Sequence, residues 1–227
     1  MSFVRMQKVS WLKDKIDEVF YPSSENVLRN ETDAYRQTFK YLLEALETFP
    51  ADKPSLNIDA DIGVFYNNPV PLEFISFDIV IMNNSRHKRG SSYRIGKDEF
   101  KPIVAFELLK GTANPESISQ LEVLKSLGIR EQYIFDPEYK YAPNGLIAFH
   151  LKENKLQEIV IKDSRVFSPA LGLEIVDTGE TLRLFNPETK SFLPTMEELT
   201  NQAAKVESLE SENEKLKAEL AKLKRQK

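Results

Sequence analysis

Cysteine is absent from the 227 residues, and histidine occurs only twice, as His87 and His150. A chain without cysteine forms no disulfide and no thiolate-ligated zinc site. This composition suits a reducing compartment, so we expect a cytoplasmic location. Two histidines also leave little material for histidine-ligated metals or for Ser-His-Asp catalysis. Any metal chemistry in this chain must therefore depend on oxygen ligands.

Long apolar runs are also missing, and no stretch of about 18 apolar residues predicts a membrane span. The first eight residues lack the apolar core of a signal peptide. The net charge of −4 argues against a polycation that coats nucleic acid, although a local basic surface would be enough for an enzyme. The sequence contains no glycine-rich phosphate loop, which makes nucleotide-driven motor chemistry a poor hypothesis.

Hydrophobic periodicity predicts an α/β domain over residues 1–195 and a separate helical tail over residues 196–227. The order expected in the domain is helix, three strands, helix, strand, followed by additional hairpins. We expect helices at 8–20, 30–49 and 116–127, and strands at 57–66, 74–82, 103–109, 132–136, 146–151, 156–161, 173–176 and 182–185.

Two of these predicted strands each carry one acid in an apolar run, Asp78 within 74–82 and Glu107 within 103–109. A carboxylate in a buried strand is costly unless a cation or a hydrogen-bonding partner compensates it. If the strands are neighbours, the two carboxylates converge and repel each other unless a cation lies between them. An oxygen-ligated Mg²⁺ or Mn²⁺ fits such a site, and Asp61 could supply a third carboxylate.

A basic loop directly follows the Asp78 strand, and its cations could contact a phosphate backbone. The candidate contacts are Arg86, Lys88, Arg89 and Arg94. The alternative interpretation treats Asp78 and Glu107 as structural acids, each paired with an arginine or lysine, and treats the loop as solvated. For one buried acid that alternative is the better hypothesis, but two such acids on consecutive strands bring the two interpretations to roughly equal standing.

The tail from residue 198 lacks glycine and proline and shows a heptad pattern. With Val206 at position a, Asn213 is also at a, while Leu209, Leu216 and Leu223 are at d. An asparagine at a favours a defined register in a two-stranded coil. Opposite charges also match between g and e positions in a parallel pair. We therefore expect a homodimer through a parallel coiled coil; a solvated single helix is the alternative.

Several segments together resemble the restriction-endonuclease-like PD-(D/E)xK superfamily, and in particular the large bacterial family of Uma-type restriction endonucleases that is common in cyanobacteria. The matching segments are 77–82, 90–94, 102–109, 127–137 and 168–173, together with the heptad tail. The resemblance covers most of the chain from about residue 57. It implies a restriction-endonuclease-like α/β core with a mixed sheet and a metal-dependent nuclease activity.

Through this resemblance, Asp78 and Glu107 would be the metal-binding acids and Asp61 a helper. A lysine of the following helix often lies near the scissile phosphate in the family, and alignment on Gly128 places Gln120 there. Lys110, just beyond the Glu107 strand, could supply the missing charge instead. The chain also departs from the family's pattern at Phe77, where proline is usual, and at 110–111, where serine-proline is usual.

The sequence thus supports two hypotheses. The first is a Mg²⁺-dependent endonuclease that cleaves DNA as a homodimer, with one site from each copy on the duplex. The second is a nuclease-fold protein without catalysis that uses its coiled coil as a dimeric binding or scaffold module; glutamine in place of lysine favours it. An enzyme acting on another phosphate-containing substrate remains a third possibility.

Overall fold

The computed structural model describes residues 31–49, 56–67, 73–83, 92–95, 101–110, 120–142 and 144–225. The chain divides into two units, Met1–Leu193 and Pro194–Lys227. Within the described residues, no helix combines the length and apolar character needed to cross a membrane.

Helix α1 (Asp33–Thr48) begins at the N-cap residue Thr32, whose Oγ1 accepts a hydrogen bond from the backbone N–H of Tyr35. A hydroxyl in this position satisfies one of the N–H groups that the first helical turn leaves unpaired. Apolar residues recur along this helix at steps of three and four, and the stripe that they form is buried, with Leu42 and Leu46 at its centre. The helix therefore forms because capping and a single core-facing stripe agree.

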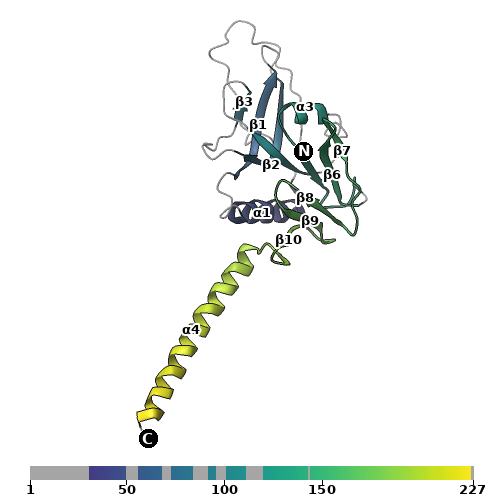
Figure 1. The fold of residues 1–227 in the computed structure, drawn as a ribbon. Coiled ribbons are helices and arrows are strands. Elements are labelled where there is room, and N and C mark those ends of the chain that lie inside the picture. The colour runs from purple at the N-terminus through teal and green to yellow at the C-terminus, as the bar shows by residue number, and fades with distance from the viewer. Residues whose placement is uncertain are drawn as a thin grey trace. The chain divides into compact units, whose positions relative to one another are not determined.

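The main sheet has seven strands in the order β3-β1-β2-β4-β5-β6-β7 (Figure 1). It is mixed, because β1/β3 and β4/β5 pair in parallel and the other neighbours are antiparallel. Its strands are β1 (Leu56–Asn67), β2 (Glu73–Asn83), β3 (Ser92–Arg94), β4 (Pro102–Leu108), β5 (Glu131–Phe135), β6 (Leu146–Lys152) and β7 (Lys155–Glu158).

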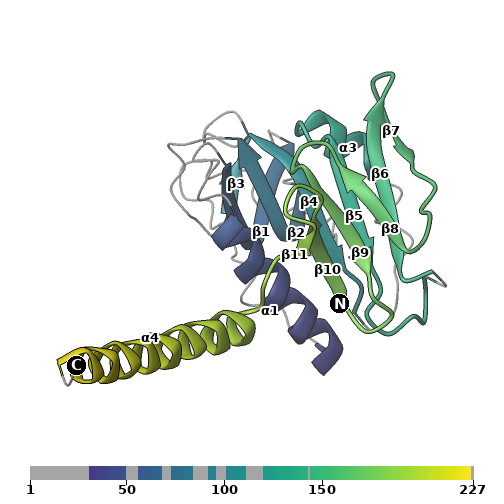
Figure 2. The same cartoon turned by 60° about the horizontal axis from the view of Figure 1, so that its bottom comes forward.

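A second sheet of four strands has the order β11-β10-β9-β8. Its strands are β8 (Arg165–Ser168), β9 (Leu173–Asp177), β10 (Leu182–Asn186) and β11 (Ser191–Phe192). Figure 2 shows α1 and this small sheet over the same side of the large sheet, and their side chains share one apolar core. The short helix α3 (Leu121–Ser126) contributes to a second core.

Alternation along β4 shows that the two cores lie on opposite faces of the large sheet. Val104 and Phe106 belong to the core beneath α1, whereas Ala105 belongs to the core beneath α3. Successive side chains of a strand point to opposite faces, so Glu107 shares the α3 face with Ala105. A strand buried on both faces has the near-continuous apolar sequence from which β4 was predicted.

The α/β class, the mixed sheet and the order of the main elements are confirmed. The short strands β3, β8 and β11 were not predicted, because two to four residues carry too little periodicity to be recognised. The predicted helix 116–127 is helical from residue 121 to 126, and its residues 116–119 lie outside the described part of the chain. The predicted helix at 8–20 lies outside it as well.

The second unit contains helix α4 (Met196–Arg225), 30 residues long. It begins with a capping box: the N–H of Thr195 donates to Glu198 Oε2 at 2.7 Å, and the N–H of Glu198 donates to Thr195 Oγ1 at 3.0 Å. This reciprocal pair satisfies two N–H groups at the start of the helix. The prediction of a helical tail is confirmed from residue 196 to residue 225.

Candidate functional site

Three acids line up across neighbouring strands of the large sheet. In the β1–β2 register Asp61 falls opposite Asp78, and in the β2–β4 register Asp78 falls opposite Glu107, one residue beyond the last paired residues. Asp61 has a left-handed backbone with φ of 54°. The core contacts of β1 change at this residue, because Ile58 belongs to the core beneath α1 and Ile62 to the core beneath α3. Asp78 therefore lies where the sheet's packing changes sides.

Asp78 is the centre of this group, and both of its carboxylate oxygens accept hydrogen bonds. Oδ1 accepts from the hydroxyl of Tyr35 on α1 at 3.0 Å, and Oδ2 accepts from the backbone N–H of Leu108 at 2.8 Å. The residue is 6% exposed. Bonds from a helix and from the end of β4 together fix the orientation of this carboxylate.

Lys110 follows β4 and points into the site. Its Nζ lies 3.3 Å from Asp78 Oδ1, 3.8 Å from Glu31 Oε1 and 4.0 Å from the centroid of the Tyr35 ring. Its side chain is only 4% exposed. A buried ammonium needs compensating charge, and the two carboxylates and the ring face supply it. From the sequence, Lys110 was expected to be able to supply a positive charge to this site, and its position is consistent with that expectation.

Glu107 has far fewer partners than Asp78. The described residues give its carboxyl one hydrogen bond, from Gln132 Nε2 to Oε2 at the long distance of 3.5 Å. The pKa of Glu107 is raised to about 8, mainly by burial and next by the negative charge of Asp78, while the positive charge of Lys110 acts to lower it. The positive charge of Lys110 therefore does not offset the effects that raise the pKa of Glu107. At neutral pH this carboxyl holds a proton that a stronger positive charge would displace.

Two buried glutamines carry amide oxygens without hydrogen-bond partners among the described residues, Oε1 of Gln132 and Oε1 of Gln120. Such atoms are costly unless something donates to them or binds them. Gln132 contacts Glu107 directly. Gln120 is the N-cap residue of α3 and is 4% exposed, but no described contact joins it to Asp78, Glu107 or Lys110.

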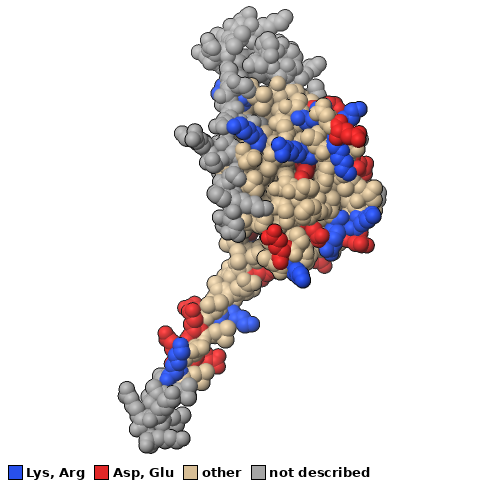
Figure 3. Space-filling model, viewed as in Figure 1, with Lys and Arg blue, Asp and Glu red and all other residues tan. Residues whose placement is uncertain are grey.

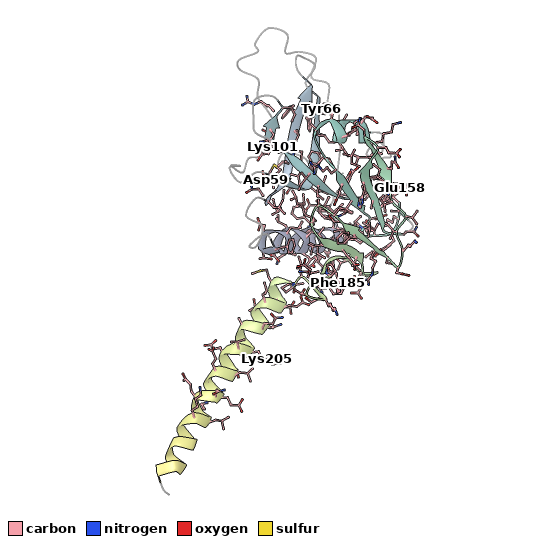
Figure 4. All side chains as sticks on the ribbon, viewed as in Figure 1. Asp59, Tyr66, Lys101, Glu158, Phe185 and Lys205 are labelled. Carbon is pink, nitrogen blue, oxygen red and sulfur yellow. The ribbon has the colours of Figure 1, made fainter. Side chains whose placement is uncertain are left out.

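Strict two-residue alternation along β1 would place Asp59 and Asp61 on one polar face, but the structure departs from this pattern. Asp59 is buried and accepts a hydrogen bond from the hydroxyl of Tyr93 on β3 (Figure 4 labels Asp59). Asp61 breaks the alternation through its left-handed backbone. It lies near enough to Tyr35 that its charge helps to raise the pKa of that hydroxyl, after burial and Asp78. A two-residue period cannot anticipate such an interruption.

The predicted nucleic-acid contacts are only partly described. Arg94 lies on β3 and is half-buried, whereas Arg86, Lys88 and Arg89 lie outside the described residues. On the face that Figure 3 shows, basic and acidic side chains are interspersed over the globular unit. The described surface on that face therefore carries charge of both signs.

Sequence reasoning missed two members of the site, Tyr35 and Glu31. Tyr35 belongs to the apolar stripe of α1, and nothing in a helical period distinguishes a tyrosine that packs from one that also donates to Asp78. Glu31 directly precedes the N-cap residue of α1, and its carboxylate reaches Lys110. Both contacts join residues that are distant in sequence, so local patterns carry no signal for them.

The described residues contain no group of three or more histidine, aspartate or glutamate side chains close enough to hold a metal ion together. The two opposing acids form a smaller donor set, to which water and substrate oxygens would have to be added.

Comparisons with known proteins give limited similarity. No family model matches the chain, and no match was found among curated proteins. Among solved structures, the chain is similar to one from Anabaena variabilis ATCC 29413 that is described as a candidate nuclease belonging to DUF820. The identity is 9% and the TM-score 0.47, over 62% of this chain and 75% of the other.

Proposed function

We propose that this protein is a divalent-metal-dependent nuclease that hydrolyses phosphodiester bonds of DNA. One observation carries the proposal: Asp78 and Glu107 oppose each other on adjacent buried strands, with the ammonium of Lys110 3.3 Å from Asp78. Two acids and one cation at a strand end are costly to bury for stability alone. A buried site with a strongly shifted pKa is a reasonable candidate for function.

The donor set fits Mg²⁺ or Mn²⁺ better than a softer metal. Mg²⁺ is commonly held by one or two carboxylates, with water and substrate phosphate oxygens completing its coordination. Asp78 and Glu107 would supply the carboxylates. The raised pKa of Glu107 supports this assignment, because the positive charge of Lys110 does not offset the effects of burial and of the Asp78 charge. When bound, such an ion would activate water and stabilise the charge that develops on the phosphate.

The chain's own residues would orient and balance this site. Tyr35 and the N–H of Leu108 hold the Asp78 carboxylate in place, and Lys110 offers a positive charge next to it. In this proposal Lys110 supplies the positive charge near the scissile phosphate, and the uncharged Gln120 does not take that role. The choice of DNA as substrate depends on the resemblance noted from the sequence and on the predicted basic loop.

The test is plasmid nicking in Mg²⁺ and in Mn²⁺, with Asp78→Asn, Glu107→Gln and Lys110→Met compared with the wild type. Loss of an electrostatic group at a reacting centre typically lowers turnover by about 100-fold or more. We expect such a loss of activity in each of the three variants. EDTA should abolish the wild-type activity, which excludes a contaminating nuclease that needs no metal. Circular dichroism confirms that each variant is folded at the assay temperature.

Two matched controls separate a local effect from a general loss of buried or surface acids. Asp59→Asn removes a buried β1 carboxylate that contacts Tyr93, and Glu158→Gln removes an exposed acid of β7 (Figure 4). Both controls should retain wild-type nicking. If Asp78→Asn and Glu107→Gln nick as fast as the controls, the assignment of the site is wrong.

A binding or scaffold module is the second candidate, and one observation favours it. Lys110 already satisfies Asp78 and Glu31, as a purely structural ion-pair network would. Calorimetric titration with Mn²⁺ distinguishes the two: binding that disappears in Asp78→Asn and Glu107→Gln supports the nuclease. Absence of any such binding in the folded wild type supports the module.

A further inference from the structure

Helix α4 exposes apolar side chains that a solitary helix has no reason to carry. Val206 is 55% exposed, Leu209 54% and Leu216 53%. Leu209 follows Val206 by 3 residues and Leu216 follows Leu209 by 7, so the three form one stripe along the helix. The other described side chains of the helix from 200 to 217 are exposed as well. A stripe of this kind is stabilised when a second helix covers it.

We propose that α4 forms a parallel, in-register, two-stranded coiled coil with the α4 of a second copy of this chain. The 30 residues of the helix cover about four heptads, or roughly 45 Å at 1.5 Å per residue. In the heptad register, the a and d positions are Leu199, Gln202, Val206, Leu209, Asn213, Leu216, Leu220 and Leu223. This proposal does not depend on the nuclease activity.

The asparagine in the stripe selects the orientation of the second helix. In a parallel in-register pair, Asn213 faces the same asparagine of the second copy, and the two amides can hydrogen-bond to each other. In an antiparallel pair that keeps all eight a and d layers, Asn213 would face Leu209 instead. A buried amide against leucine is left unsatisfied and costs free energy.

The charges flanking the stripe select the same orientation. In the parallel pair, each g position meets the following e position of the second copy, which brings together Lys205 with Glu210 and Glu212 with Lys217. In the antiparallel pair, Glu212 would meet Glu212 of the second copy, and like charges would face each other. Figure 3 shows acidic and basic side chains interspersed along α4, and Figure 4 labels Lys205 on it.

The absence of cysteine from the chain makes the orientation directly testable in the full-length protein. Leu209→Cys places one thiol at a d position, where a parallel in-register pair brings it against its own copy. Ser211→Cys places a thiol two residues away at the outward f position and is the matched control. Mild oxidation should convert most of Leu209→Cys to a disulfide-linked dimer and little of Ser211→Cys.

Sedimentation equilibrium of the wild type at micromolar concentration should give twice the chain mass of 26.1 kDa. Leu216→Glu should reduce this to the mass of one chain, while Ser211→Glu, on the outer face, should not. A monomeric wild type would overturn the proposal. A dimer in which Leu209→Cys crosslinks no faster than Ser211→Cys would overturn the parallel register. Nicking activity is measured separately, so failure of either proposal leaves the other identifiable.

Discussion

Glu107 and Glu131 are the same residue type on neighbouring strands of one sheet, yet their surroundings differ sharply. Glu131 is 4% exposed and accepts three hydrogen bonds, from the hydroxyls of Tyr133 and Ser168 and from the N–H of Ala170. Glu107 is 7% exposed, and the described residues give it one long bond, from Gln132. Burial alone therefore does not distinguish the two acids; the number of donors does.

The bonds of Glu131 explain its presence as a structural feature. They join β5 to the turn that follows β8, and the N–H of Leu171 adds a bond to Ser168 Oγ. This carboxylate fastens the small sheet to the large one. In the part of the chain that the structure describes, Glu107 makes no comparable set of bonds, so it is the better candidate for a functional role. The comparison teaches that an under-bonded buried acid is the better functional candidate.

The largest expected difference between the two acids is in stability. Glu131→Gln replaces an acceptor oxygen by an NH₂ group facing donors, and we expect it to lower the free energy of unfolding by about 2–3 kcal/mol. Glu107→Gln should change it by less than about 1 kcal/mol at pH 7, because the native carboxyl is largely protonated there. Urea unfolding measures both, and equal losses would contradict the comparison.

The pH dependence of stability is the next test. The pKa of Glu107 is raised from 4.5 to about 8 in the folded chain, so the folded state binds more protons than the unfolded state between these values. Stability from this group is present at low pH and falls as pH rises toward 8, by at most about 1.4 kcal/mol per pH unit.

Comparing the wild type with Glu107→Gln isolates this contribution. Urea unfolding at pH 6, 7 and 8 should show a growing advantage of the variant as pH rises. The pKa of His150 is lowered, mainly by burial, and contributes with the opposite sign, but it does so in both proteins. A constant difference across this range would show that the Glu107 pKa is not raised.

The smallest expected effect is the change in the pKa of Glu107 that Lys110→Met causes. The ammonium of Lys110 lowers the pKa of Glu107, so its removal should raise that pKa further. Carbon-13 NMR of the Glu107 carboxyl would follow the titration. Lys125→Met, on α3 beside Glu122, is the control and should leave the titration unchanged. A downward shift in Lys110→Met would contradict the placement of Lys110.

Local pattern was sufficient for much of the fold and for the two principal acids. The strands of Asp78 and Glu107 were recognisable because both faces of each are apolar, and a carboxylate in such a run stands out. The heptads of α4 predicted a helix because their apolar residues recur at helical spacing. By contrast, Glu131 drew no attention, because its partners at 168 and 170 are almost 40 residues away.

The sequence by itself determined the α1 stripe, the principal strands, the helical tail and the presence of two acids where apolar residues prevail. These follow from periodicities of two and 3.6 residues, which depend only on near neighbours. Only the tertiary structure decided that Tyr35 and Lys110 meet at Asp78 and that Asp61 interrupts β1. It also decided that, among the described residues, Glu107 receives one long hydrogen bond. Those outcomes depend on contacts between distant segments, and the balance of charge in a buried site exists only once the chain has folded.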